Sequence, residues 1–153
     1  CNGVYGDKAS ALDRFCTNFE LLPESVKTRL TVENDDKASM YSVKDLMYIH
    51  KRIGIPIVFD YHHHKFCPGD MTEQEALELA ISTWPEGITP VVHYSESKAL
   101  HESNEKLKPQ AHSDYIDNTP NTYGNTVDIM VESKAKELSI LPHLKLNPDL
   151  TIS

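Results

Sequence analysis

Residues 55–64 have the sequence Ile-Pro-Ile-Val-Phe-Asp-Tyr-His-His-His. The first five are apolar and rich in β-branched side chains, which is typical of a strand that is buried on both faces of a sheet. Such strands occur in parallel sheets that are covered by helices. The apolar run stops at Asp60, and ionisable side chains follow directly. The stretch therefore predicts an α/β protein in which a buried strand ends at a cluster of polar side chains.

Three more segments share this β-rich pattern, namely residues 29–33, 89–94 and 126–132. Helical patterns lie between them, so helix and strand alternate along the whole chain, as expected of parallel βα units. One connection between two strands differs from the others, because residues 96–125 form a long, polar stretch that is rich in turn-forming residues. Loops of that length in compact domains are usually functional.

Two of the predicted helices are marked by capping boxes, in which a hydroxyl side chain and an acidic side chain three residues later each bond to the other's backbone N–H. Ser42 with Asp45 opens one helix, and Gly54 is expected to end it. Thr72 with Glu75 opens the other. These local signals predict both helices without reference to the rest of the chain.

Two further helices are predicted from periodicity. Residues 7–22 place their apolar side chains on one helical face, and Pro23 stops the pattern. A last helix is expected to begin at Ser133 and to end or kink near Pro142, because proline lacks the N–H that a helix interior requires.

The chain has 153 residues, enough for one domain but not for two of ordinary size. Hydrophobic residues make up 39% and charged residues 25%, which excludes a disordered chain. The formal net charge of −8 argues against a broad basic surface for nucleic acid and favours a site that collects cations. No apolar stretch approaches the ~20 residues of a membrane-spanning helix, so no role in a membrane is expected.

The beginning of the sequence lacks both a methionine and the pattern of a signal peptide, so we interpret the chain as a piece of a longer protein. Its three cysteines, Cys1, Cys16 and Cys67, form no C-x-x-C pair and no disulfide framework. This indicates a reducing, intracellular setting, which would be the cytoplasm of a prokaryote or virus-infected cell, or the nucleus of a eukaryote.

The apolar runs of the four predicted strands finish at acidic or imidazole side chains, Glu33, Asp60, His93 and Glu132. In a parallel βα fold the carboxyl ends of the strands meet at one edge, where such folds build their active sites. Carboxylates and imidazoles are ligands for Zn²⁺ or Mn²⁺. No cysteine is among these four residues, which disfavours a structural zinc site of the thiolate type. We therefore expect these four residues to hold divalent ions jointly and to be catalytic.

Two more clusters extend the predicted site. His63 follows Asp60 by three residues, so it can turn back toward a neighbouring metal while the intervening side chains point elsewhere. His112 lies in the long polar connection, where apolar flanking residues could fix its position.

Each of these residues also has a local interpretation. Glu33 and Glu132 could be acids that favour a helix N-terminus, and Asp60 could be a helix cap. His93 could be a hydrogen-bonded core histidine, and residues 62–64 could form a solvated loop. The coincidence of all of them at one edge favours the metal site over these separate explanations.

At these residues the sequence resembles the UV damage endonucleases. Several long motifs agree in order across nearly the whole chain, which makes the resemblance specific. The matching segments are residues 4–8, 29–36, 55–63, 90–95, 111–116 and 128–137.

The resemblance implies a (β/α)8 TIM barrel, of which residues 1–153 would be the carboxyl-terminal half of a single domain, strands five to eight. It implies up to three divalent ions, usually Mn²⁺, with Zn²⁺ as the other candidate. It also implies cleavage of double-stranded DNA on the 5′ side of a cyclobutane pyrimidine dimer or (6-4) photoproduct. The implied metal ligands are Glu33, Asp60, His63, His93, His112 and Glu132.

The chain departs from the family where the barrel would begin. The family takes two further histidine ligands from earlier strands, so the missing amino-terminal half is an expected partner. Val91 stands where some members carry a lysine. Lysines in or near the predicted edge loops could contact DNA phosphates despite the acidic total. They are Lys8, Lys65, Lys98, Lys106, Lys108 and Lys134.

Two other functions stay open at this point. A metal-dependent TIM-barrel sugar isomerase also places Glu, Asp and His at its strand ends, and nicking of irradiated duplex without turnover of free sugars would exclude it. The other is a metal-binding half-barrel that has no catalytic activity and takes its missing strands from a partner chain.

Overall fold

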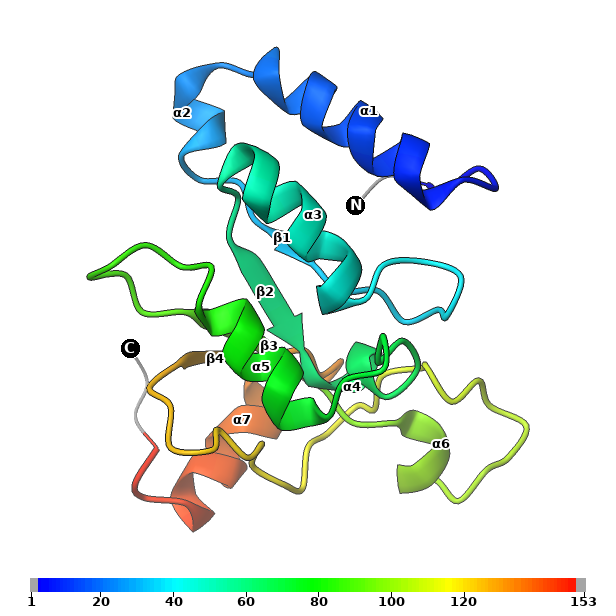
Figure 1. The fold of residues 1–153 in the computed structure, drawn as a ribbon. Helices are drawn as coiled ribbons and strands as arrows, with labels where there is room; N and C mark the ends of the chain where they lie inside the picture. Colours follow the sequence, from blue (N-terminus) through cyan, green and yellow to red (C-terminus); the bar gives the residue numbers. More distant parts are fainter. Residues whose placement is uncertain (1–2, 151–153) are drawn as a thin grey trace.

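The computed structural model describes residues 3–150, which form a parallel sheet of four strands. The strands lie side by side in the order of the chain, and each neighbouring pair is parallel (Figure 1). They are β1 (Val32–Glu33), β2 (Ile57–Asp60), β3 (Val91–Tyr94) and β4 (Asp128–Val131). The predicted parallel βα arrangement is confirmed.

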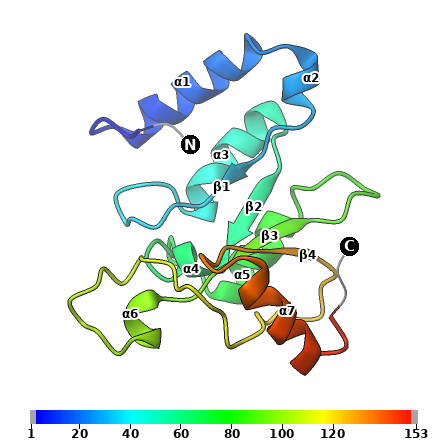
Figure 2. The same cartoon turned by 180° about the vertical axis from the view of Figure 1, so that it is seen from behind.

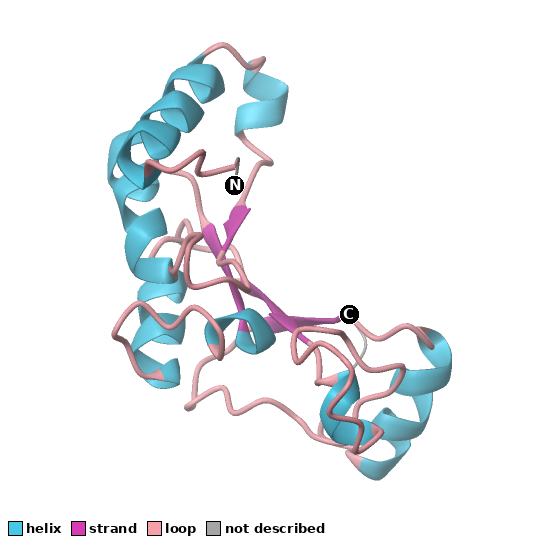
Figure 3. Ribbon diagram, turned by 90° about the vertical axis from the view of Figure 1, so that its right-hand side faces the viewer, coloured by secondary structure: helices cyan, strands magenta, loops and turns pink. Residues whose placement is uncertain are grey.

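Three helices lie on one side of this sheet. They are α1 (Lys8–Glu20), α3 (Val43–Ile53) and α5 (Glu73–Ile81). Helix α3 packs against β1 and β2, α5 packs against β2, and α1 packs on α3. Figure 2 shows the strands from the opposite side, and Figure 3 shows helices along the outside of an arc with the strands along its inside.

The core lies between the sheet and these helices. Ile57 and Phe59 of β2 pack with Leu46 and Ile49 of α3 and with Leu77 of α5, and all five side chains are fully buried. Burial of a side chain of this size contributes about 1.5–3 kcal/mol, so this layer fixes the strands relative to the helices.

Four more helices complete the described part of the chain, and three of them, with four residues each, were not predicted from the sequence. These three are α2 (Glu24–Lys27), α4 (Tyr61–His64) and α6 (Lys98–His101), whereas α7 (Glu137–Leu146) corresponds to the last predicted helix. Helix α4 follows β2 directly, and α6 lies inside the long connection between β3 and β4.

Both predicted capping boxes are confirmed. Ser42 Oγ accepts from the Asp45 N–H at 3.2 Å, and Asp45 accepts from the Ser42 N–H at 2.9 Å. Thr72 and Glu75 make the same reciprocal pair at 3.3 and 2.8 Å. Gly54 ends α3 with φ +70°, the left-handed conformation that glycine adopts without strain.

The first strand is shorter than residues 29–33. The N–H groups of Arg29 and Leu30 both donate to the carbonyl of Val26, each at 3.0 Å, so these residues complete the turn after α2. The expected start of this strand was wrong because the local helical turn takes its hydrogen-bond donors.

The last helix begins at Glu137 rather than at Ser133. The N–H of Lys134 donates to Ser113 O at 3.3 Å, and the N–H of Ala135 donates to Asp114 O at 2.9 Å. The first expected turn is therefore bonded to the long connection instead of forming a helix. Helix α7 then runs through Pro142 to Leu146, so the helix does not end at the proline.

The cysteines Cys16 and Cys67 are buried free thiols, whereas Cys1 lies outside the described residues. Among residues 3–150, none of the helices has the length and apolar character needed to cross a membrane.

Candidate metal centre

The four residues at the ends of the strands lie on the same face of the sheet. Side chains alternate along a strand, so paired residues of parallel strands share a face, as do residues two apart. Asp60 lies two residues after Val58, and Glu132 lies two residues after Met130. The relevant pairs are Glu33 with Val58, Asp60 with His93, and His93 with Met130. The register therefore explains why these side chains meet although they are far apart in sequence.

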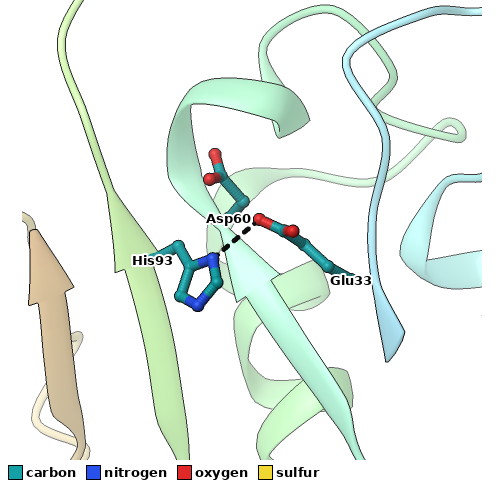
Figure 4. A group of neighbouring side chains, drawn as sticks. All are labelled: Glu33, Asp60 and His93. Carbon is teal, nitrogen blue, oxygen red and sulfur yellow. Dashed lines mark hydrogen bonds and ion pairs between the residues drawn. The ribbon is translucent and has the colours of Figure 1, made fainter. Parts of the chain in front are cut away.

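Glu33, Asp60 and His93 form the centre of the group. One ligand atom from each lies within 4.8 Å of the others. Figure 4 shows the three side chains converging near the carboxyl ends of the strands, with the dashed line marking the 2.8 Å hydrogen bond between Glu33 Oε1 and His93 Nδ1. This is the convergence that the strand-end pattern predicts.

The other three predicted ligands lie next to this centre. Glu132 Oε1 is 3.3 Å from His93 Nδ1, and Glu132 Oε2 is 3.5 Å from His112 Nδ1. On the other side, His63 Nδ1 lies 3.6 Å from Glu33 Oε1 and 3.9 Å from Asp60 Oδ2. All six predicted ligands thus form one continuous group of neighbouring ligand atoms.

Backbone contacts fix Asp60 at the end of its strand. The side chain of the buried Asn34 donates to Asp60 O at 3.0 Å and accepts from Asp60 N–H at 2.8 Å. Asp60 Oδ1 accepts from the N–H of His63 at 2.7 Å and so caps α4. The cap interpretation of Asp60 is therefore correct, and it is compatible with metal binding because the cap uses only one carboxylate oxygen.

The short helix α4 decides which histidines reach the site. His63 turns back toward Glu33, and its Nδ1–H donates to Asn34 O at 2.9 Å. His62 and His64 are buried away from solvent, so a solvated loop at residues 62–64 is wrong. Burial lowers the pKa of His62 to about 4, and its neutral ring stacks edge-on against His112 with centroids 5.4 Å apart.

The pKa values at the centre are set mainly by burial and by the contact between Glu33 and His93. Burial raises the pKa of Asp60 to about 7, and the nearby Glu33 adds to this effect. Burial also acts to raise the pKa of Glu33, but the hydrogen bond and charge of His93 outweigh it and hold the pKa below its usual value. The same hydrogen bond raises the pKa of His93. A cation among these carboxylates would offset the cost of keeping them charged in a buried place.

The residues fit a divalent ion. Asp60 Oδ2 is buried and has no hydrogen-bond partner among the described residues, although buried polar atoms are normally bonded. The surrounding donors are carboxylate oxygens and imidazole nitrogens, the ligand types that suit Mn²⁺ and Zn²⁺. The unpartnered oxygen and the donor set together mark this place as a candidate metal centre.

The family model described as UV-endonuclease UvdE matches residues 1–152. The chain belongs to this family.

Curated relatives and a solved structure agree with this membership. The chain is 38% identical over 144 residues to the UV-damage endonuclease of Schizosaccharomyces pombe, which covers 90% of this chain and 23% of that protein. It is 36% identical over 148 residues to the UV DNA damage endonuclease of Bacillus cereus (strain Q1), which covers 91% of this chain and 44% of that protein. A crystal structure of SacUVDE superposes with a TM-score of 0.80 at 34% identity, covering 97% of this chain and 50% of that one.

The chain spans less than half the length of these UvdE relatives and half of the solved SacUVDE chain. Its four parallel strands with their helices are an α/β half-barrel, as the sequence predicts.

One polar group was missed from the sequence. Glu96, His101 and Asp117 bring their side chains together within the long connection, with ligand atoms within 4.8 Å of one another. His101 carries no local signal, because it lies in a polar stretch with no apolar pattern around it. The only hint was the position of Glu96, three residues beyond His93 at the same strand end.

Proposed function

We propose that this chain is the carboxyl-terminal half of a DNA repair endonuclease, which hydrolyses the phosphodiester 5′ to cyclobutane pyrimidine dimers and (6-4) photoproducts with the help of divalent ions. The observation that carries the proposal is the continuous group of six carboxylate and imidazole side chains at the carboxyl edge of the sheet in a member of the UvdE family. Damage to cellular DNA implies an intracellular site of action.

The proposed domain is one TIM barrel whose second half is residues 1–153. Among the described strands, β1 and β4 each pair on one side only. An open edge presents unpaired N–H and C=O groups, and closure into a barrel removes it. The proposed partner is therefore the other half of the barrel, consistent with the 50% coverage of the SacUVDE chain.

The proposed ions are Mn²⁺, up to three of them, with Zn²⁺ as the alternative. Bound there, divalent ions would polarise the scissile phosphate, lower the pKa of a water molecule and stabilise the leaving oxygen. Glu33 is the proposed bridging ligand, because its Oε1 already lies near both His93 and His63. Asp60, His93 and Glu132 are also proposed as ligands and, with Glu33, as the catalytic groups. His63 and His112 are proposed as ligands only.

Damaged double-stranded DNA is the proposed substrate. A photolesion is already poorly stacked, so extruding it costs less than the few kcal/mol required for a normal pair. Two of the edge lysines are engaged within the protein, because Lys8 pairs with Asp45 at 2.9 Å and Lys98 with Asp114 at 3.2 Å. The lysines that we propose for phosphate contact are therefore Lys65, Lys106, Lys108 and Lys134.

Metal binding is tested by thermal unfolding with and without Mn²⁺. At a free concentration of 100 Kd, a bound ion stabilises the folded state by about 2.7 kcal/mol. For a chain of this length that corresponds to a rise in Tm of about 5–11 °C. Glu33→Gln should lose most of this rise, whereas Glu102→Gln, on the exposed surface after α6, should keep it. A Glu33→Gln variant with the full Mn²⁺ stoichiometry would contradict the ligand assignment.

Activity is tested by nicking of UV-irradiated plasmid with Mn²⁺. The chain is assayed together with the part of the Bacillus cereus relative that it does not span, supplied as a fusion. Nicking of irradiated but not untreated plasmid, lost in Glu33→Gln and kept in Glu102→Gln, is the expected result. A fusion that binds Mn²⁺ but leaves irradiated DNA intact would refute the proposed reaction.

A further inference from the structure

The segment that carries His112 is held against the chain that leaves β3. We call residues 111–118 the His112 segment. Ser97 and His112 form an antiparallel bridge, with Lys98 N–H donating to Ala111 O at 2.8 Å and Ser113 N–H donating to Glu96 O at 2.7 Å. The backbone on both sides of His112 is therefore bonded to residues 96–98.

The side chain of Glu96 holds the far end of the same segment. Glu96 is 8% exposed, and its Oε1 accepts from the N–H and the side-chain amide of Asn118 at 2.8 and 3.2 Å. Its Oε2 accepts from the N–H of Asp117 at 3.1 Å and forms a short contact with His101 Nε2. The hydroxyl of Tyr94 in β3 donates to Oε1 at 2.8 Å. One buried carboxylate thus joins β3, α6 and the His112 segment.

These contacts also argue against a second metal site at Glu96, His101 and Asp117. Both oxygens of Glu96 are already occupied by donors from Tyr94, His101, Asp117 and Asn118. A cation would have to displace several of these hydrogen bonds, and charge-assisted bonds of this kind are the strong ones. The group is better described as a structural anchor.

The position of the His112 segment matters because the segment also contacts Glu132 and the chain that follows it. His112 Nδ1 lies 3.5 Å from Glu132 Oε2, and the carbonyls of Ser113 and Asp114 accept from the chain that leaves β4. His112 is the one predicted ligand that comes from a long connection rather than from a strand end or the helix after it. Its position therefore depends on whatever orders that connection.

We infer that Glu96 is a positioning residue, which orders the His112 segment and so keeps His112 next to Glu132 for a shared divalent ion. This inference rests on the proposed function, since it assigns His112 and Glu132 to the metal centre. Residues that orient metal ligands typically change metal affinity 10–100-fold when they are replaced.

The test combines amide hydrogen exchange with Mn²⁺ binding measured by electron paramagnetic resonance on the full chain. The variants are Glu96→Gln, Glu102→Gln, His112→Ala and the double variant Glu96→Gln/His112→Ala. In Glu96→Gln, the amides of Ser113 and Asn118 should exchange at least tenfold faster, and Mn²⁺ affinity should fall by about 10–100-fold. Glu102→Gln should match the wild type in both measurements.

The double variant separates positioning from general loss of structure. If Glu96 acts through His112, the replacement of Glu96 has no further effect on Mn²⁺ affinity once His112 is alanine. A further loss in the double variant, or faster exchange in Glu96→Gln with unchanged Mn²⁺ affinity, would overturn the inference. A wild type that binds no Mn²⁺ would overturn the proposed function, and unchanged exchange in Glu96→Gln would overturn the anchor on its own.

The amides of Leu77 and Ala80 in α5 report whether a variant is folded, because both residues are buried in the core and the hydrogen-bond partners of Glu96 lie in other segments. If they also lose protection in Glu96→Gln, the same comparisons are made with Glu96→Asp, which retains the charge. That variant should show an intermediate loss of Mn²⁺ affinity that is again absent from the His112→Ala background. An Asp variant whose Mn²⁺ affinity falls equally in both backgrounds would overturn the inference.

Discussion

Replacing Glu96 with glutamine should destabilise the protein by an amount that depends on pH. The hydrogen bonds to Glu96 and its contact with His101 overcome the effect of burial and lower the pKa of this carboxyl to about 2. Its side chain is 9% exposed, so solvent screens these interactions little. Relative to the ordinary value of 4.5, the shift corresponds to about 3 kcal/mol of stability when the group is ionised in both states.

The direction of this pH dependence follows from whether the folded or the unfolded state binds the proton of Glu96 more tightly. Because the pKa is lower in the folded protein, the unfolded chain takes up the proton first as the pH falls. The stabilisation is therefore complete above about pH 5 and is lost progressively toward pH 2. Between pH 6 and pH 3.5 the difference in unfolding free energy between wild type and Glu96→Gln should shrink by about 1 kcal/mol.

Urea denaturation of both proteins at each pH measures this difference. Comparing the two proteins removes the contributions of all other carboxyl groups, which are common to both. The control Glu102→Gln should show a small difference that hardly changes with pH, because Glu102 pairs with Lys98 on the surface. A cost of Glu96→Gln that is the same at pH 3.5 and pH 6 would refute the charge-based explanation of the anchor.

Two other substitutions test how the site is supported. Asn34→Ala leaves the buried backbone N–H and C=O of Asp60 without their partners, so urea denaturation should show a loss of about 2–4 kcal/mol. Gly69→Ala places a methyl group 2.6 Å from Ser42 Cβ at a φ of +63°, whereas the same change at Gly54, with φ +70°, meets no atom within 4 Å. Gly69→Ala should therefore lower stability by at least about 1 kcal/mol more than Gly54→Ala, and equal losses would show that the contact with Ser42 is unimportant.

Much of the candidate site was predictable, because the positions of its residues depend on the alternation of side chains along a strand. Glu33, Asp60 and His93 each follow or end an apolar run, and in parallel strands that brings them to one edge. The separation of two residues between inward-facing positions then places them on a common face. His63 was predicted from its position three residues after Asp60, and the short helix α4, which was not predicted, supplies the turn that brings it back.

Other features depend on contacts that no local pattern encodes. Residues 133–136 have no helix in the structure because two of their N–H groups bond to the His112 segment. The role of Glu96 depends on donors as distant as Asn118, 22 residues further along the chain. Neither the path of the long connection nor its hydrogen bonds follows from composition or periodicity.

The sequence by itself determined the order of the four strands and of the longer helices, the capped starts of α3 and α5, and the set of residues that meet at the sheet edge. These features depend on side-chain alternation, helical periodicity and hydrogen bonds over three or four residues, which are all local. Only the tertiary structure decided that His112 lies beside Glu132, that His62 is buried, and that the carboxylate of Glu96 bonds to the backbone of the His112 segment. Those arrangements arise where chain segments far apart in sequence exchange hydrogen bonds, and such bonds exist only once the sheet has brought the segments together.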